Sequence, residues 1–154
     1  MNLVIVSRAQ ISETLEHLKS AGKRRSECVV LWLGRRGAEG IVVEKVWCPP
    51  HRAGRAFFEF SEEAMTAMFA ELRKSRQMIA AQVHSHPMEA FHSAADDHWA
   101  IVRHEGALSL VIPYFARHTF TDSFLGDMAA FVLTPDDAWT EIGFEKLENH
   151  LTIR

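Results

Sequence analysis

Short apolar runs alternate with amphipathic stretches along the chain, a pattern typical of a sheet packed against helices. Runs of strand length lie at residues 3–6, 28–33, 40–47, 78–83, 108–112, 128–133 and 138–142. Two stretches carry apolar residues at helical spacing, one around Ser12 and one after Ser61. Together they predict an α/β (α+β) fold, in which helices flank a mixed sheet.

The two helices carry recognisable end signals. The first is expected to start at Ser12 and to stop at Gly22, and the second to start at Ser61 ahead of two glutamates. The apolar stripe of the second helix is expected to be core: Met65, Met68, Phe69 and Leu72. Residues 34–37 suit a hairpin turn, and residues 113–122 suit a mobile flap.

The segment with the clearest chemical potential follows the apolar run 78–83. On a strand, His84 and His86 point to the same side, and Pro87 then ends the strand. Ser93 is suited to cap a following helix and Asp96 lies in its first turn, from which it can face the histidines. Two imidazoles and a carboxylate, with water in the fourth position, form the ligand set of a catalytic zinc ion.

Each part of this segment also has an ordinary explanation. The chain has nine histidines, so a His-x-His pair arises readily by chance, and Ser-x-x-Asp is a common capping box. The order of the parts is more specific than any one of them: an apolar strand, the histidine pair, a short loop and a capped helix. That order favours a metal site.

The same segment resembles the JAMM motif of the JAB/MPN metallopeptidases. Its His-Ser-His-Pro at 84–87 and Ser-x-x-Asp at 93–96 match the two downstream parts of that motif. The family also has an upstream glutamate on a strand that closes with glycine, and here residues 27–34 begin with Glu27 and end with Gly34. Valine and tryptophan replace the usual glycine and leucine between them.

This likeness covers residues 15–143, nearly the whole chain, and includes the strand at 106–113. It implies a single JAB/MPN-type domain over residues 1–154, with the cytidine-deaminase-like fold. It further implies Zn²⁺ as the cofactor, because the family's motif residues bind zinc.

The resemblance assigns a role to each motif residue. His84, His86 and Asp96 are the expected zinc ligands. Glu27 is the expected general base, which takes a proton from zinc-bound water and returns it to the leaving amine. Ser93 is expected to donate to the oxyanion that develops on the attacked carbonyl. Without the resemblance, Glu27 alone reads as a solvated carboxylate at a strand end.

The third ligand has a competitor. The family's usual spacing from the second histidine selects Asp97, whereas Ser-x-x-Asp selects Asp96. Adjacent helical residues point about 100° apart, so both cannot bind one ion. A loop absorbs a deletion more easily than a helical turn that holds two active-site groups, which favours Asp96.

Two other groups of residues are candidates for a functional role. Glu44 is a second-ranked candidate base, expected to face outward beside Lys45. In the family, an insertion near residues 48–58 helps to hold the protein substrate. By that resemblance this surface contains Arg52, Arg55, Phe57 and Phe58, and the alternative is an ordinary loop whose aromatic residues return to the core.

Composition narrows the partners. The chain has 154 residues, of which 47% are hydrophobic, and a net charge of −3, which gives no electrostatic reason to expect nucleic-acid binding. No apolar run is long enough for a membrane span, and no secretory signal is visible, so a cytoplasmic protein is expected. Cys28 and Cys48 are expected to be buried free thiols.

The resemblance implies a zinc isopeptidase or peptidase that removes a ubiquitin-like protein from its conjugate or precursor. The chain resembles compact bacterial members of the family that are encoded beside ubiquitin-like conjugation enzymes. By that resemblance, such conjugation enzymes are expected partners. One alternative keeps the zinc and processes the C-terminus of a sulfur-carrier protein. The other is a metal-free interaction scaffold, as degenerate family members are. The oligomeric state is not predicted.

Overall fold

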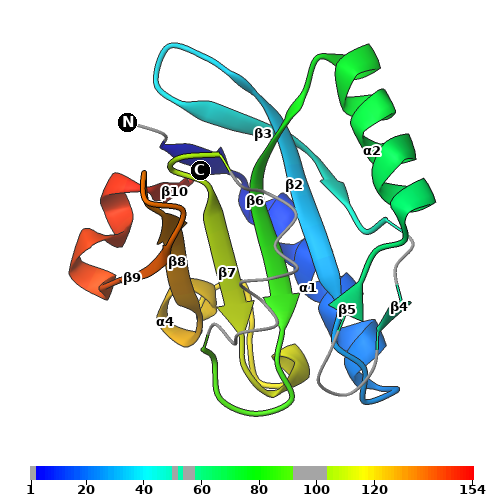
Figure 1. Cartoon of the computed structure of the whole chain (residues 1–154). Coiled ribbons are helices and arrows are strands. Elements are labelled where there is room, and N and C mark those ends of the chain that lie inside the picture. The colour runs from blue at the N-terminus through cyan, green and yellow to red at the C-terminus, as the bar shows by residue number, and fades with distance from the viewer. Residues whose placement is uncertain (1–2, 50–51, 54–57, 92–103) are drawn as a thin grey trace.

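A computed structural model describes residues 3–49, 52–53, 58–91 and 104–154. Within these residues, eight strands form one sheet in the order β10-β1-β3-β2-β6-β7-β8-β9 (Figure 1). Its strands are β1 (Val4–Val6), β2 (Val29–Arg36), β3 (Ile41–Trp47), β6 (Met78–Ser85), β7 (Leu108–Ile112), β8 (Ala129–Leu133), β9 (Trp139–Ile142) and β10 (Leu151–Ile153). The pair β4 (Arg52–Ala53) and β5 (Phe58–Glu59) lies outside it.

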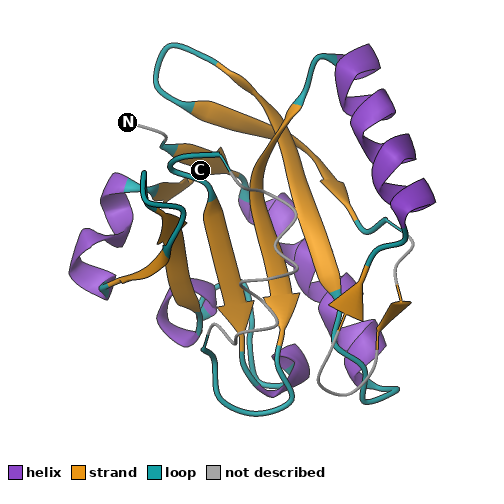
Figure 2. Ribbon diagram, viewed as in Figure 1, coloured by secondary structure: helices purple, strands orange, loops and turns teal. Residues whose placement is uncertain are grey.

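The sheet is mixed, as the sequence predicts. Strands β6 and β7 run parallel, as do β1 with β3 and β1 with β10, whereas the remaining neighbours are antiparallel. Figure 2 shows α1 (Arg8–Gly22) passing behind the strands, with α2 (Glu62–Ser75) separate from it. The shorter helical segments are α4 (Phe124–Asp127), η1 (Tyr114–Ala116) and η2 (Phe144–Asn149). The predicted α/β (α+β) architecture is confirmed.

Alternating residues of β2 face two different hydrophobic clusters. Val30 and Trp32 pack with residues of α1, whereas Val29 and Leu31 pack with Met68 of α2. A strand sends successive side chains to opposite faces, so α1 and α2 must cover opposite faces of the sheet. Burial on both faces explains why β2 reads as a continuous apolar run rather than an alternating one.

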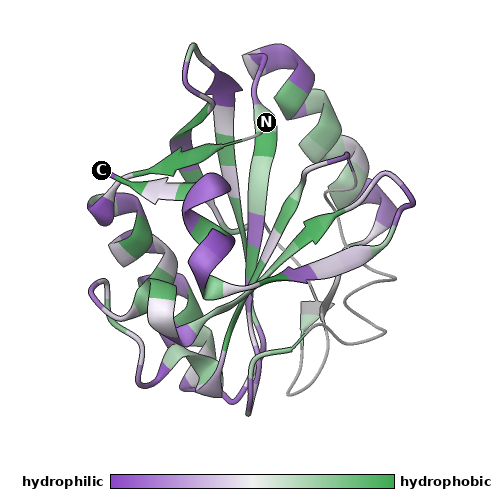
Figure 3. Cartoon of the chain, turned by 90° about the vertical axis from the view of Figure 1, so that its left-hand side faces the viewer, coloured by the Kyte–Doolittle hydropathy of each residue, from purple (hydrophilic) through white to green (hydrophobic). Residues whose placement is uncertain are grey.

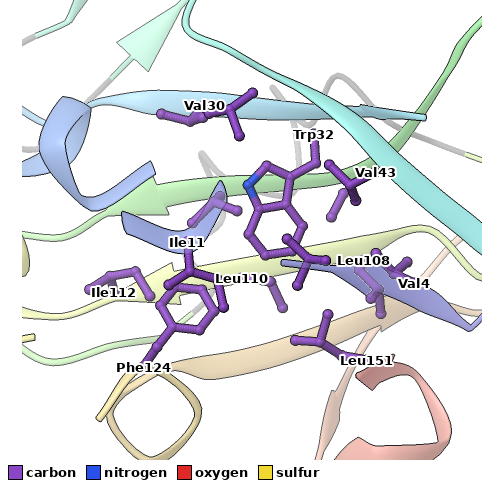
Figure 4. Packing of buried hydrophobic residues seen from close by; sticks show 14 of the residues in the cluster. Val4, Ile11, Val30, Trp32, Val43, Leu108, Leu110, Ile112, Phe124 and Leu151 are labelled. Atoms are coloured by element: carbon purple, nitrogen blue, oxygen red, sulfur yellow. The ribbon is translucent and has the colours of Figure 1, made fainter. Parts of the chain in front are cut away.

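The larger cluster is built around Trp32 on the α1 face (Figure 4). This side chain is fully buried, its ring centroid lies 6.1 Å from that of Phe124, and its Nε1 donates to Thr14 Oγ1 at 2.8 Å. The indole therefore buries its polar atom with a partner. In Figure 3, hydrophobic colours run along much of the sheet, and hydrophilic colours appear at turns and on the helical segments.

The hairpin turn predicted at residues 34–37 lies at 37–40, because β2 continues to Arg36. Three other local predictions were wrong. Helix α1 begins after Ser7, not at Ser12: Ser7 Oγ accepts from Gln10 N at 3.1 Å, and the Gln10 side chain accepts from Ser7 N at 3.0 Å. This reciprocal capping box satisfies two backbone donors. Phe69 is 41% exposed rather than core, because the buried face of α2 turns toward Met68 and Leu72.

The third error concerns residues 113–122, predicted to form a flap. Phe115 and Ala116 are buried, and Lys19 Nζ of α1 donates to Ala116 O at 2.6 Å. The segment is therefore packed against α1. No sequence signal indicated β10, which pairs in parallel with β1, Val4 opposite Leu151, so that the first and last strands lie side by side (Figure 1).

Among the helices that the structure describes, none combines the length and apolar character needed to cross a bilayer.

Gly34 is expected to be indispensable for the pairing of β2 with β3. A Cβ added there meets the Val42 carbonyl oxygen and lies 3.2 Å from Val43 Cα, both backbone atoms that cannot rotate away. Gly34→Ala should therefore lower the free energy of unfolding by about 1–3 kcal/mol, as overpacking typically does. Urea denaturation measures this loss as a lower midpoint at unchanged slope.

The matched control is Gly126→Ala in α4, where an added Cβ meets no atom within 4 Å. This variant should be as stable as the wild type or slightly more stable, because alanine is the better helix former. Equal stabilities of the Gly34→Ala and Gly126→Ala variants would contradict the close backbone approach at Gly34.

Candidate active site

Strand β6 carries two imidazoles to one edge of the sheet. His84 is the penultimate residue of the strand and is fully buried, while His86 follows the strand's last residue and is 3% exposed. Their ring centroids lie 5.3 Å apart at an interplanar angle of 50°. The two histidines thus lie side by side, as the spacing of two on a strand predicts.

The ring of His86 is oriented by its own turn. Its Nδ1 lies 3.3 Å from the carbonyl oxygen of Glu89, and the edge of its ring packs against Phe91 with centroids 4.7 Å apart. A carbonyl oxygen only accepts, so this contact is a hydrogen bond when Nδ1 carries the proton. The neutral ring then presents the Nε2 lone pair, which is the arrangement of a metal-binding histidine.

The pairing of β2 with β6 brings Glu27 to the same place. Val29 lies opposite His84, and the ladder continues beyond β2: Ser85 N donates to Cys28 O, and Cys28 N donates to Ser85 Oγ, both at 3.1 Å. One more step of this register puts Glu27 opposite His86. The Glu27 side chain is 4% exposed, so the solvated carboxylate of the ordinary explanation is not what the structure shows.

Ser85 has a structural role in this arrangement. Its hydroxyl accepts from the backbone of the residue that follows Glu27, so it ties the start of β2 to the end of β6. Because Ser85 lies between the two histidines, its side chain points to the opposite side of the strand from theirs.

A cavity of about 470 Å³ opens beside Glu27. It lies between the C-terminal half of α1 and the segment that leads from β3 to β4. Its lining residues are His17, Ser20, Ala21, Arg24, Ser26, Glu27, Cys28, Cys48, Pro49 and Ala53. Glu27, whose backbone lies opposite His86, is therefore also at the wall of this cavity.

The two cysteines meet at this cavity as free thiols, with their sulfur atoms 3.7 Å apart. The hydrogen bond to Cys48, together with burial, raises the pKa of the Cys28 thiol. The same hydrogen bond lowers the pKa of the Cys48 thiol. The predicted free thiols are confirmed, although only Cys28 is fully buried.

A buried polar pair beneath the histidines was missed by the sequence analysis. Gln82 Nε2 donates to Ser109 Oγ at 3.1 Å, and both residues are fully buried. Gln82 precedes His84 by two residues and therefore lies on the same face of β6. The available signal was a glutamine and a serine, each alone inside an apolar strand.

Several predicted site residues lie outside the described part of the chain. These are the candidate oxyanion donor Ser93 and the two candidate ligands Asp96 and Asp97. Among the described residues, no group of three or more His, Cys, Asp and Glu side chains is placed to hold a metal ion. Of the predicted zinc ligands, only His84 and His86 lie within the described residues. The choice between Asp96 and Asp97 as the third ligand therefore stays a prediction.

The remaining candidates are Glu44 and the residues of the predicted substrate-holding surface. Glu44 faces outward, where its carboxylate accepts from Arg35 Nη1 at 2.9 Å, so it is not placed to act as the base. Arg55 and Phe57 lie outside the described residues. The backbones of Arg52 and Phe58 belong to the short β4–β5 pair.

These features define a mixed-sheet protein with two imidazoles and a buried carboxylate at one sheet edge. No protein-family model matches the chain. A curated relative, "Probable metalloprotease y4jG" of Sinorhizobium fredii, is 31% identical over 97% of this chain and 93% of its own length. The chain belongs to the family of this probable metalloprotease.

A solved structure shares the fold. The solution structure of protein DSY2949 from Desulfitobacterium hafniense matches 99% of this chain and 93% of its own, with a TM-score of 0.69. The two sequences are 19% identical, so the likeness concerns the arrangement of strands and helices.

Proposed function

We propose that the protein is a zinc-dependent peptidase of the JAMM type, which cleaves a ubiquitin-like protein from its conjugate or precursor. The observation that carries this proposal is the pairing of β2 with β6, which brings the backbone of Glu27 opposite His86, whose ring centroid lies 5.3 Å from that of His84. Membership in the family of a probable metalloprotease supports the general class of reaction. The motif that the sequence shares with JAB/MPN peptidases supports the subclass.

The residues present fit a zinc ion by their chemistry. Imidazole and carboxylate are common zinc ligands, and the contact of His86 Nδ1 with a carbonyl oxygen leaves the other ring nitrogen for a metal. His84, His86 and Asp96 would hold the ion. When bound, zinc polarises a carbonyl and lowers the pKa of a bound water to about 7.

The protein's own groups would then move the proton and position the substrate. Glu27 accepts a proton from the attacking water and donates it to the leaving amine. Its burial at the wall of the cavity keeps bulk water away, which strengthens its electrostatic interactions with the reacting groups. Ser93 donates a hydrogen bond to the oxygen of the attacked carbonyl.

The cavity beside Glu27 supports the proposed substrate class. It has a volume of about 470 Å³, and its wall includes Pro49 and Ala53, at the start of the β4–β5 pair. An extended C-terminal tail of a small folded protein fits such an entrance, because its globular part can stay outside.

Cleavage of defined fusions tests this proposal. The full-length protein is incubated with ubiquitin-like proteins joined to a reporter by a peptide bond or by an isopeptide bond. We expect release of the reporter at the C-terminus of the ubiquitin-like module, loss of release with a chelator, and recovery on addition of Zn²⁺. Mass spectrometry of both products locates the cut.

Two outcomes would contradict the proposal. One is a zinc-loaded protein that leaves every fusion intact, which would favour the scaffold alternative. The other is cleavage that continues unchanged in the presence of chelator. Cleavage confined to a sulfur-carrier fusion would move the substrate to the second alternative and leave the zinc chemistry in place.

A further inference from the structure

Basic side chains gather at the C-terminal end of α1, although the chain as a whole carries a net charge of −3. A cavity of about 280 Å³ lies there between the end of α1, the turn that follows it and η1. It is lined by Lys19, Gly22, Lys23, Arg25, Phe115 and Arg117. Among these described lining residues, four are cationic and none is acidic. We call Lys19, Lys23, Arg25 and Arg117 the basic surface.

The most buried member of the basic surface is Lys19. Its Nζ donates to Ala116 O at 2.6 Å and lies 4.7 Å from the centre of the Phe120 ring. An ammonium has three donors, so this contact leaves capacity for an anionic ligand. Partial burial lowers the pKa of Lys19, because the charged form loses hydration there. A bound carboxylate would restore the lost stabilisation.

The backbone around the basic surface is held in an uncommon conformation. Tyr114, Phe115 and Ala116 have φ values of 55°, 53° and 59°, and Arg25 has φ of 54°. Such left-handed values are costly for residues other than glycine, and strained residues of this kind cluster at active sites and ligand-binding segments. The close approach of Phe115 to α1 needs Gly22, since a Cβ there lies 2.6 Å from Phe115 Cβ.

The basic surface extends to the turn that directly follows the histidine pair. Arg25, Phe115 and Arg117 also line a second cavity of about 320 Å³, whose wall includes Pro87 and Met88. Phe115 N donates to His86 O at 2.7 Å, and Tyr114 N donates to Met88 O at 2.8 Å. The strained turn that carries Arg117 is therefore fixed to the residues that directly follow β6.

We propose that the basic surface binds an acidic segment of the protein substrate, next to the bond that is cleaved. This rests on the proposed peptidase function, since it takes the histidine pair as the reacting centre. Two adjoining cavities form an elongated site, and exposed apolar side chains of Met88 and Tyr114 accompany its cations. Such a mixture suits a peptide with acidic and apolar side chains better than a small inorganic anion. Arginine is well suited to grip carboxylates, because its planar fork matches their geometry.

Binding is measured by fluorescence anisotropy with the full-length Glu27→Gln variant, which keeps the peptide uncut, and with the wild type. The probe is a short labelled peptide of alternating glutamate and leucine, and its counterpart has glutamine in place of glutamate. We expect the acidic peptide to bind and the glutamine peptide to bind at least about fivefold more weakly, with a difference that shrinks as salt is added.

Variants locate the binding. Arg25→Gln/Arg117→Gln should weaken binding of the acidic peptide at least about fivefold, as expected when two charge-assisted contacts are lost. The matched control is Arg73→Gln/Lys74→Gln, which removes two cations from the last turn of α2, at the other end of β6. This control should bind like the parent protein.

Three outcomes would overturn the inference. Equal weakening in the two double variants would show a general charge effect, and unchanged binding in Arg25→Gln/Arg117→Gln would exclude this surface. Displacement of the peptide by an equal concentration of inorganic phosphate would indicate a small-anion site. Peptide binding is measured without hydrolysis, so a protein that does not bind the acidic peptide can still be the proposed peptidase. Conversely, a protein that cleaves no fusion can still bind the acidic peptide at this surface.

Discussion

Glu27→Gln is expected to lower the rate of peptide hydrolysis by about 10²–10⁴-fold while zinc stays bound. Glutamine keeps the size of the side chain but cannot take a proton from water at neutral pH. Because Glu27 lies opposite His86, outside the set of predicted ligands, the metal content should not change. Initial rates of fusion cleavage, together with the zinc content of the purified variant, measure both effects.

Glu44→Gln is the control for this substitution. Glu44 was the competing base, and the structure pairs it with Arg35 on the outer surface. Its variant should cleave at the wild-type rate. Wild-type activity in Glu27→Gln, or a loss of activity in Glu44→Gln as large as the predicted one, would contradict the assignment of the base.

The second large effect concerns the third ligand. Asp96→Asn is expected to abolish zinc binding and hydrolysis, whereas Asp97→Asn should keep both. Removing a residue that hydrogen-bonds to a metal ligand typically lowers metal affinity about 10–100-fold. Removing a ligand itself should lower the affinity for zinc by more than that. Competition with a metal-binding dye measures the affinity of each variant, and the neighbouring position serves as the control of equal size and charge.

The opposite result, with zinc lost only in Asp97→Asn, would show that Asp97 is the third ligand, at the family's usual spacing from the second histidine. Zinc retained in both single variants and in His86→Ala would refute the whole ligand set. His86→Ala belongs in the series because His86 is a predicted ligand whose ring is oriented by the contact of its Nδ1 with the Glu89 carbonyl oxygen.

The sequence predicted seven strands of the main sheet, because each contains a short apolar run. Strand β6, for example, was expected from residue 78 and ends at Ser85, shortly before Pro87. The prediction of the start of α1 failed because two serines compete for the N-cap position. Ser12 resembles a cap, yet Ser7 wins because Gln10 completes the reciprocal hydrogen bonds with it.

Longer-range features were harder to predict. Strand β10 has three residues and owes its place to the edge of β1, which a local pattern does not reveal. Residues 113–122 are polar enough to suggest a flap, but Lys19 and Gly22 of α1 fix Phe115 and Ala116 in the structure. Both depend on contacts between segments far apart in the chain.

The candidate site shows the same division. The histidine pair could be derived from its spacing alone, because a strand turns every second side chain to one face. The position of Glu27 could not, since the register of β2 on β6 decides it. Only the resemblance to a known motif selected Glu27 from the sequence, and the ladder that joins Cys28 to Ser85 supplies a physical reason for its placement.

The most direct test is the structure of the zinc-loaded protein, with the metal located by anomalous scattering at the zinc edge. We expect one ion bound to His84, His86 and Asp96, with the Glu27 carboxylate within hydrogen-bond reach of its bound water. An ion that avoids both histidines, or a Glu27 side chain turned away from that water, would contradict the assignment of this edge of the sheet as the catalytic centre.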